Sequence, residues 1–373
     1  MAGPDTSATT GFAAGEPRAY LGRTQLPDVL TLRAEFGAVT LQGVDGLRIA
    51  RSLARMDDLQ GVDLDPATYR DRPASAATTG SRAGRTADQL ALPGMDFPAL
   101  DWITTQADLG LPIVRTAGRR IRVGRLEELR AELDRDYPVP VSVVLALDSG
   151  WLGTRHVACL TEELRRADRD VSLVFAAPFD PLNSVPRVSA LRGLLRWGTD
   201  AGRSVELLRT DLAGLPAVLE GAAMAAIGLI TSTRHLGMPL AGQQRADYTR
   251  RQRSPLVFVP RLMHWQRASV LGALARWHGA GVTHCECAAC LYAGRGLLRF
   301  ADADHLTPTE LGRAVREHDA LALSALIRQI MTAADPASEL RHRRRNAAER
   351  AVAVSTSLDV PLVPPPAWLS GWD

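Results

Sequence analysis

Three of the chain's four cysteines lie within six residues, in the stretch HCECAACLYAGRGLLRF that begins at His284. They are Cys285, Cys287 and Cys290, in the spacing Cys-x-Cys-x-x-Cys. Disulfides are rare in a reducing cytosol, and cysteines two positions apart are poorly placed to bridge each other. Closely spaced thiolates suit Zn²⁺, which takes four tetrahedral ligands. The cluster therefore predicts a zinc site that needs a fourth ligand, with an iron–sulfur cluster as the alternative.

Three histidines lie near enough in sequence to supply that ligand. His284 adjoins a cysteine and would strain the chelate, whereas His305 and His318 are further along. A capping box at 307–310 predicts the start of a helix. The apolar stripe of this helix holds Leu311, Ala314, Val315, His318, Leu321 and Ala322. His318 thus faces inward and is the favoured ligand, with His305 as the second candidate.

Three cysteines and a histidine form a closed coordination shell. Such a shell has no open position for an activated water, so the predicted zinc is structural and staples a loop to a helix. Cys159 lies far upstream beside an apolar helical face, and we expect it not to be a ligand.

The elements that must position this site alternate along the chain. Short apolar, β-branched runs are followed by stretches of helical periodicity, which is typical of parallel α/β folds. The expected strands are 61–65, 112–116, 141–148, 171–177, 205–211, 225–231, 256–262 and 281–285. Eight such units predict an α/β fold of the (β/α)8 TIM-like barrel type with a C-terminal zinc-binding segment. A doubly wound open sheet is the competing architecture, but no glycine-rich dinucleotide fingerprint follows any strand.

In a barrel, chemistry is expected where strands end and the following loops begin. The polar residues at those positions are Asp65, Arg115, Asp148, Asp180, Asp211, Thr231, Arg234, His235, His264 and His284. Asp148 and Asp211 are favoured, because each is the first carboxylate after an apolar run. We expect their carboxylates to approach each other, with Arg115 or Arg234 as a countercharge.

The domain organisation follows from composition. Residues 1–15 are predicted to be disordered, and 16–283 to form the barrel with a flexible loop near 72–90. Residues 284–335 form the zinc-binding segment and its helix. Residues 336–373 are predicted to be a basic and then Pro-rich tail.

The net charge and the hydropathy of the chain bear on whether it binds nucleic acid or a membrane. All 44 basic residues are arginines, and the net charge of +3 is too small to indicate nucleic-acid binding by itself. The basic run 340–350 is either a solvated helix end or a phosphate-binding patch. With no long apolar run and no secretory signal pattern, we expect a cytoplasmic protein without a membrane span.

The cysteine motif and its surroundings resemble the tRNA-guanine transglycosylase family. Members are zinc-containing (β/α)8 barrels whose C-terminal Cys-x-Cys-x-x-Cys site is closed by a histidine. Here the matching residues are Cys285, Cys287, Cys290 and His318. The histidine stands in REHDALALSALI, and 27 residues separate it from the last cysteine, close to the gap in the family.

The resemblance also implies catalytic carboxylates. Asp148 in VVLALDSGW is similar to the family's base-binding aspartate, and RTDLAGLP, which contains Asp211, retains a glycine and a proline of a later motif. The nucleophile motif departs from the family. The stretch GAAMAAIGLITSTR keeps Thr233 and Arg234 but has alanines where the aspartate belongs, and the competing stretch GAGVTHCEC has His284 there. The family's spacing brings Asp247 into consideration instead.

Three hypotheses result. The first is a divergent transglycosylase (a pentosyltransferase) that exchanges guanine for a 7-deazaguanine in tRNA or DNA, as in queuosine-type tRNA modification, with Asp148, Asp211 and Asp247 as candidate catalytic residues. The second is a non-catalytic nucleic-acid-binding protein or partner subunit of the same fold, for which a homo- or hetero-dimer is compatible. The third is an unrelated barrel enzyme with a structural zinc.

Overall fold

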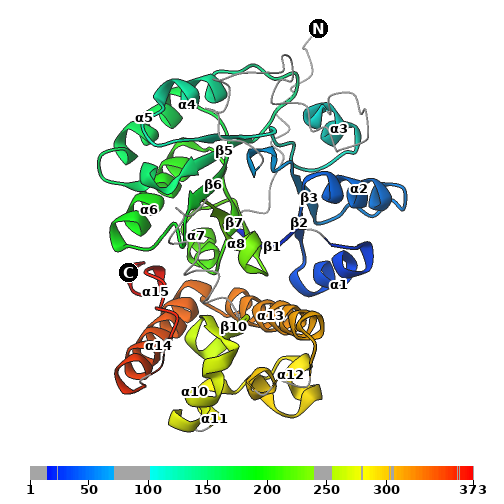
Figure 1. The fold of residues 1–373 in the computed structure, drawn as a ribbon. Coiled ribbons are helices and arrows are strands. Elements are labelled where there is room, and N and C mark those ends of the chain that lie inside the picture. The colour runs from blue at the N-terminus through cyan, green and yellow to red at the C-terminus, as the bar shows by residue number, and fades with distance from the viewer. Residues whose placement is uncertain are drawn as a thin grey trace, which may run out of the picture.

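Eight parallel strands form the main path of one curled sheet, in the neighbour order β3-β2-β1-β8-β7-β6-β5-β4 (Figure 1), and a short ninth strand, β9 Leu236–Gly237, pairs with β6. The computed structural model describes residues 15–22, 24–70, 101–238, 254–278, 280–301, 303, 306–358, 360 and 362–372. The strands are β1 Glu16–Leu21, β2 Val39–Gln42, β3 Val62–Asp65, β4 Arg119–Ile121, β5 Val143–Asp148, β6 Val171–Ala177, β7 Val205–Thr210 and β8 Met224–Gly228. Their order is chain order around a ring with a seam between β3 and β4, which confirms the expected (β/α)8 TIM-like barrel.

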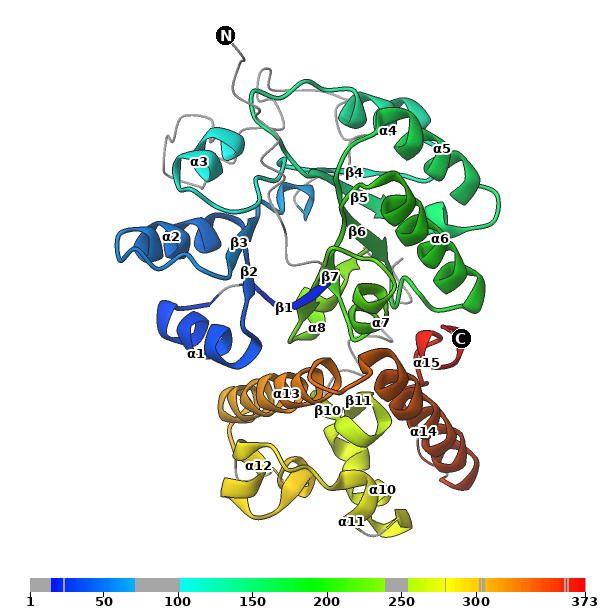
Figure 2. The same cartoon turned by 180° about the vertical axis from the view of Figure 1, so that it is seen from behind.

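A helix follows each strand and covers the outside of the sheet (Figures 1 and 2). The helices are α1 Leu26–Phe36, α2 Gly43–Ala54, α3 Trp102–Asp108, α4 Leu126–Leu133, α5 Val157–Ala167, α6 Val185–Ala201, α7 Gly214–Leu219 and α8 Thr231–Arg234. In β5, Val143, Leu145 and Leu147 belong to the main core, whereas Val144 and Ala146 belong to a separate cluster of buried side chains. Both faces of the strand are therefore buried, which is why it reads as a continuous apolar run.

A buried arginine spans the seam between β3 and β4. Arg115 forms a parallel bridge to Ser142, just before β5. Its Nη1 donates to the Leu64 backbone oxygen at 3.1 Å and lies 3.0 Å from Asp63 Oδ1, both on β3. Its Nε donates to Glu206 at 2.9 Å. Arg115 therefore belongs to a charged layer near the amino ends of the strands, and its expected role as a countercharge at the barrel mouth is wrong.

Three expected barrel strands are not strands of the barrel: 112–116 contains only the single bridge of Arg115 to Ser142, and the fourth strand, β4, lies further along the chain at Arg119–Ile121. The expected strand at 256–262 contains β10 Leu256–Val259, which pairs antiparallel with β11 His264–Arg267, and 281–285 begins in helix α11 Ala280–Thr283. The barrel instead begins with β1 and β2. These were missed because β1 is not a continuous apolar run: Arg18 donates to Asp63 at 2.8 Å in the charged layer.

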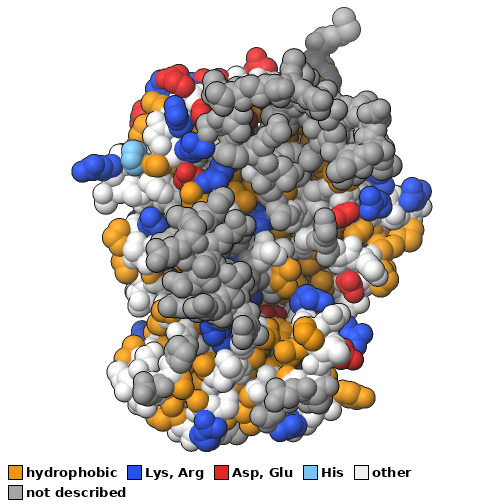
Figure 3. Space-filling model, viewed as in Figure 1, with side chains coloured by type: hydrophobic (Ala, Val, Ile, Leu, Met, Phe, Trp, Pro, Cys, Tyr) orange, Lys and Arg blue, Asp and Glu red, His pale blue; other side chains and the backbone are white. Residues whose placement is uncertain are grey.

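The segment after the barrel forms a separate group of elements below it in Figures 1 and 2. Its α13 packs against α1, and its α14 against α7. On the face shown in Figure 3, hydrophobic side chains gather over the lower part of the molecule, with arginines among them. Besides β10, β11 and α11, the segment contains η3 Pro260–Leu262, η4 Ala268–Val270, α10 Leu271–His278, α12 Ala288–Ala293, η5 Gly296–Phe300, α13 Pro308–Met331, α14 Pro336–Ser357 and α15 Trp368–Gly371.

The expected C-terminal tail is a helix followed by a strap. The basic run lies in α14, and Arg344 of that helix donates to the Leu369 backbone oxygen at 3.0 Å. Closer to the end of α14, the backbone N–H and oxygen of Val363 both form hydrogen bonds of 2.9 Å with the side chain of Gln266, in the way that they would pair with a neighbouring strand. Trp368 is buried, and α15 packs against α6 of the barrel. We call residues 362–372 the C-terminal strap.

Several expectations lie outside the described residues. These are the disorder of residues 1–14, the flexible loop near 72–90, and the roles of Asp247 and His305. Among the residues that the structure does describe, no helix combines the length and the apolar character needed to cross a membrane.

Candidate functional site

The four predicted metal ligands meet in one buried cluster. Cys285 lies in the loop after α11, Cys287 is the N-cap of α12, and Cys290 lies in the first turn of that helix. The Cys290 N–H donates to the Cys287 backbone oxygen at 2.9 Å, so the turn brings both sulfurs to one side. His318 comes from the middle of α13, which begins with the expected capping box between Thr307 and Glu310.

The distances between the four side chains fit a tetrahedral zinc ion. His318 Nδ1 lies 3.9, 3.4 and 3.3 Å from the sulfurs of Cys285, Cys287 and Cys290. Zn–S and Zn–N bonds of ordinary length at tetrahedral angles place sulfur and nitrogen about 3.6 Å apart. Hydrogen bonds among the cysteines lower the pKa of the Cys287 thiol and raise that of the Cys290 thiol. The residues therefore fit a metal ion, and this donor set is typical of zinc.

The other nitrogen of His318 fixes the ring in the required orientation. Nε2 lies 2.8 Å from the Phe258 backbone oxygen, an acceptor only, so Nε2 carries the proton. The lone pair of Nδ1 is then free to face the three sulfurs. A hydrogen bond of this kind on the far nitrogen is the usual support for a metal-binding histidine.

The next residue, Asp319, connects the cluster to the barrel. Its carboxylate accepts from the Phe258 N–H at 2.9 Å and from Trp265 Nε1 at 2.8 Å. It also lies 3.6 Å from Arg234, which follows β8, and the Arg234 guanidinium stacks 3.5 Å from the centre of the Trp265 ring. Burial lowers the pKa of Arg234 to about 10, against the attraction of Asp319 and Asp211. Arg234 is thus held between the metal segment and the mouth of the barrel.

Two carboxylates and a histidine meet at the mouth. Asp180 follows β6, Asp211 follows β7 and His235 follows α8, and one ligand atom from each lies within 4.8 Å of the others. The carboxylates are fixed by backbone donors at 2.8 Å, from Leu182 to Asp180 and from Ala213 to Asp211. His235 Nε2 lies 3.9 Å from Asp211.

Burial shifts the titration of all three groups. Burial raises the pKa of Asp180 to about 6, and the nearby charge of Asp211 adds to this effect. Burial also raises the pKa of Asp211, against the Ala213 N–H and the charge of Arg234. Burial lowers the pKa of His235 to about 4, so this imidazole is neutral at pH 7. The two carboxyls can therefore keep a proton at a pH where isolated aspartates have lost theirs.

Asp148, the other favoured aspartate, pairs with Arg120 and not with Asp211, which was the expected partner. It ends β5, and its Oδ1 accepts from Arg120 at 2.9 Å. The carboxylate beside Asp211 is that of Asp180, since β6 stands between β5 and β7 in the sheet. Asp180 and His235 were recognised in the sequence only as members of the polar rim. Their position after apolar strands was the signal, but no spacing linked either residue to Asp211.

A further polar group lines the interior of the barrel near its mouth. Asp65, at the end of β3, accepts from Tyr20 at 2.6 Å and from the Tyr69 hydroxyl. Arg209 lies over the Tyr20 ring, 5.4 Å from its centre, and donates to the backbone oxygens of Ser232 and His235. The tyrosines and Arg209 were not predicted, because they stand within strands or a short helical turn and have no motif around them.

Comparisons with known proteins do not assign a family. No family model matches the chain, and no curated protein matches it. One similar solved structure is a mutant tryptophan synthase alpha-subunit from the hyperthermophile Pyrococcus furiosus. The identity is 13%, the match covers 58% of this chain and 88% of that chain, and the TM-score is 0.31. A likeness this weak carries no argument about function, so the barrel assignment rests on strand order.

Proposed function

We propose that this protein is a zinc-stapled barrel that exchanges guanine for a 7-deazaguanine in tRNA or DNA. The observation that carries the proposal is the pair of carboxylates at the mouth of the barrel, of which Asp211 is buried and Asp180 is half-buried. The metal segment supports it, because its ligand set is the part of the chain that resembles transglycosylases. We further propose a cytoplasmic location, where cysteine ligands stay reduced.

The pair can supply both groups that base exchange requires. With one shared proton, one carboxylate is a nucleophile and the other carboxyl is an acid. The ionised Asp211 oxygen forms a bond to C1′ of the ribose while the bond from C1′ to guanine breaks. The electron pair leaves with the base, which takes the proton of Asp180. The incoming base returns a proton to Asp180 and attacks C1′, which releases Asp211.

Several residues support this chemistry without reacting. The neutral His235 lies beside the pair, with its Nε2 3.9 Å from Asp211, and Arg234 favours the ionised form of Asp211. A zinc ion held by the three cysteines and His318 would have four protein ligands and no open position, so its contribution would be to hold the segment together. Because Arg234 contacts Asp319, that segment also orients a charge of the mouth.

The test is a base-release assay on tRNA and DNA with labelled guanine, with a 7-deazaguanine as the incoming base. We expect Asp211→Asn to reduce exchange by at least about 100-fold, with unchanged metal content. Asp148→Asn serves as the comparison, because Asp148 is bound by Arg120 and lies outside the pair. A greater loss with Asp148→Asn than with Asp211→Asn would shift the catalytic assignment to β5. Full exchange by the Asp211→Asn variant would refute this mechanism.

A second function, nucleic-acid binding without catalysis, is favoured by one observation. One of the two segments that compete for the nucleophile position in the resemblance contains β8, but β8 has no carboxylate, and Gly228 at its end is packed against the following turn. A Cβ added at Gly228 would lie 2.3 Å from the Thr233 backbone. The wild-type protein would then bind tRNA or DNA tightly yet release no guanine, which is the outcome that would favour this function.

A further inference from the structure

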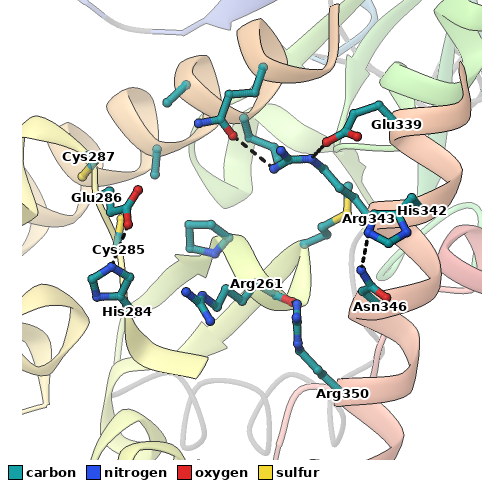
Figure 4. A pocket seen from close by; sticks show the side chains of 16 residues that line it. Arg261, His284, Cys285, Glu286, Cys287, Glu339, His342, Arg343, Asn346 and Arg350 are labelled. Carbon is teal, nitrogen blue, oxygen red and sulfur yellow. Dashed lines mark hydrogen bonds and ion pairs between the residues drawn. The ribbon is translucent and has the colours of Figure 1, made fainter. Parts of the chain in front are cut away.

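A polar cavity of about 470 Å³ lies beside the metal cluster (Figure 4). It is bounded by the cysteine loop, by η3 and by the helices α13 and α14. Figure 4 shows His284 and Glu286 on one side of the cavity and His342, Asn346 and Arg350 of α14 on the other. We call this cavity the α14 groove. It is separate from the carboxylate pair at the barrel mouth, whose residues do not line it.

Helix α14 has two faces, and only one of them lines the groove. Residues 339, 342, 343, 346 and 350 line it at helical spacing. The other face is buried and holds Leu340, Arg344, Ala347, Ala351 and Val354. The basic run of the sequence is therefore divided: Arg344 points into the core, whereas Arg343 and Arg350 line the groove.

The charges of the groove do not cancel. Glu339 accepts from Arg343 at 2.5 Å, and Glu286 lies 2.9 Å from His284. Two arginines remain, Arg261 of η3 and Arg350 of α14. Arg350 donates to the Arg261 backbone oxygen at 3.3 Å, and within the part of the chain that the structure describes neither guanidinium forms an ion pair with a carboxylate. Two arginines without a carboxylate partner among the described residues thus face the cavity, and Glu286 is the carboxylate that remains there, because His284 carries a charge only if protonated.

We propose that the α14 groove binds the phosphodiester backbone of a nucleic-acid strand. Guanidinium groups match phosphate oxygens in geometry and charge, and the amides of Asn346 and Gln329 can add neutral donors. Among the described residues, no Phe, Tyr or Trp side chain lines the groove, and its aromatic rings are the imidazoles of His284 and His342, so contact with the backbone is favoured over stacking on bases. The identity of the strand as tRNA or DNA rests on the proposed function, but the phosphate contact does not.

The test compares two double variants in a binding titration. Arg261→Gln with Arg350→Gln removes the two unpaired charges of the groove. Arg341→Gln with Arg345→Gln removes two exposed arginines of α14 that do not line it. Fluorescence anisotropy of a labelled tRNA hairpin and a single-stranded DNA oligomer is measured from 50 to 300 mM salt, after metal content and thermal stability have been matched.

We expect the groove variant to bind about 10-fold more weakly at 100 mM salt. The slope of log K against log salt should fall by about 1 to 2, as for the loss of two phosphate contacts. The control should lose less than a third as much affinity. Equal losses in both variants would assign the effect to net charge alone and overturn the proposal. Displacement of the oligomer by polyglutamate as effectively as by polyphosphate would also overturn it, in favour of an acidic protein partner.

The binding experiment and the base-release assay can fail independently of each other. If the wild type releases no guanine while the groove variant still loses binding, the groove assignment stands and the catalytic proposal fails. If the wild type exchanges base and the groove variant does so with the same KM for tRNA and for DNA, the groove assignment fails by itself.

Discussion

The metal cluster and the barrel mouth are both built from a few polar side chains, but the chain assembles them in different ways. Three metal ligands lie within six residues, and a single helix supplies the fourth. The mouth combines Asp180, Asp211 and His235, each placed by a different strand or turn of the barrel. The cluster therefore depends on local geometry, whereas the mouth depends on the whole sheet. Substitutions should separate the two, because the cluster stabilises its segment and the burial of charge at the mouth opposes folding.

The largest effect is expected at the metal cluster. Cys287→Ser removes a thiolate, and metal binding at such a site contributes directly to folding free energy. We expect the metal content to fall well below one equivalent and the free energy of unfolding to drop by more than about 4 kcal/mol. Elemental analysis and urea denaturation measure the two. A variant that retained both metal and stability would show that Cys287 is not a ligand.

The next effect concerns the connection between the two regions. Asp319→Asn would keep an acceptor for the Phe258 N–H but would turn an amide donor toward Trp265 and leave the buried Arg234 with the more distant Asp211 as its carboxylate. We expect a loss of about 3 kcal/mol, because breaking a buried ion pair strands its partner. Metal content should be retained, since Asp319 is not a ligand. Urea denaturation with metal analysis tests this, and an unchanged stability would mean that Arg234 finds another partner.

At the mouth of the barrel, we expect a substitution to increase the stability of the protein, whereas the substitutions above decrease it. Because burial raises the folded pKa of Asp180 to about 6 from an ordinary 3.8, its ionised form opposes folding. This penalty is absent below about pH 4, grows between pH 4 and 6, and is complete above pH 6. Asp180→Asn should therefore be more stable than the wild type by about 1–2 kcal/mol at pH 8 and nearly equal to it at pH 4. Denaturation curves at four pH values measure this, and destabilisation at pH 8 would make Asp180 a structural cap.

The smallest effect is expected at Cys159. It lies on α5 of the barrel, is partly buried, and is absent from the cluster of metal ligands. Cys159→Ala should leave the metal content unchanged and shift stability by less than about 1 kcal/mol. It is the matched control for Cys287→Ser, and loss of metal from it would overturn the ligand assignment.

Much of the fold could be predicted from the sequence, because buried parallel strands are apolar on both faces. β5 to β8 were located by this pattern. It failed for β1, whose Arg18 points into a charged layer, for β2, and for β4, whose three residues include two arginines. It also misassigned β10, because an apolar run of four residues does not reveal whether the strand pairs within a barrel or in a separate two-stranded sheet.

The metal ligands could be predicted because three of them lie close together in the sequence and the fourth lies on a single helix. The spacing of the cysteines and the inward stripe of α13 determine which side chains can meet. The carboxylate pair could not be predicted, because the distance between Asp180 and Asp211 depends on loops that leave neighbouring strands. To recognise Asp180, rather than Asp148, as the partner of Asp211, one would have to know how far each loop returns over the barrel. The periodicity of the sequence does not contain this information.

The C-terminal strap has a consequence for the order of assembly during synthesis. Gln266 binds Val363 and α15 packs on α6, so the strap touches both the metal segment and the barrel. The ribosome makes the barrel strands first, then the cysteine loop and α13, and only afterwards residues 362–372. Since domains fold largely as they emerge, the barrel and the metal segment, which share one core and meet through α13 on α1 and α14 on α7, can form before the strap exists. The strap is then the last segment to bind, and a nascent chain held just short of it would contain the barrel and the metal segment without the contact of α15 with α6.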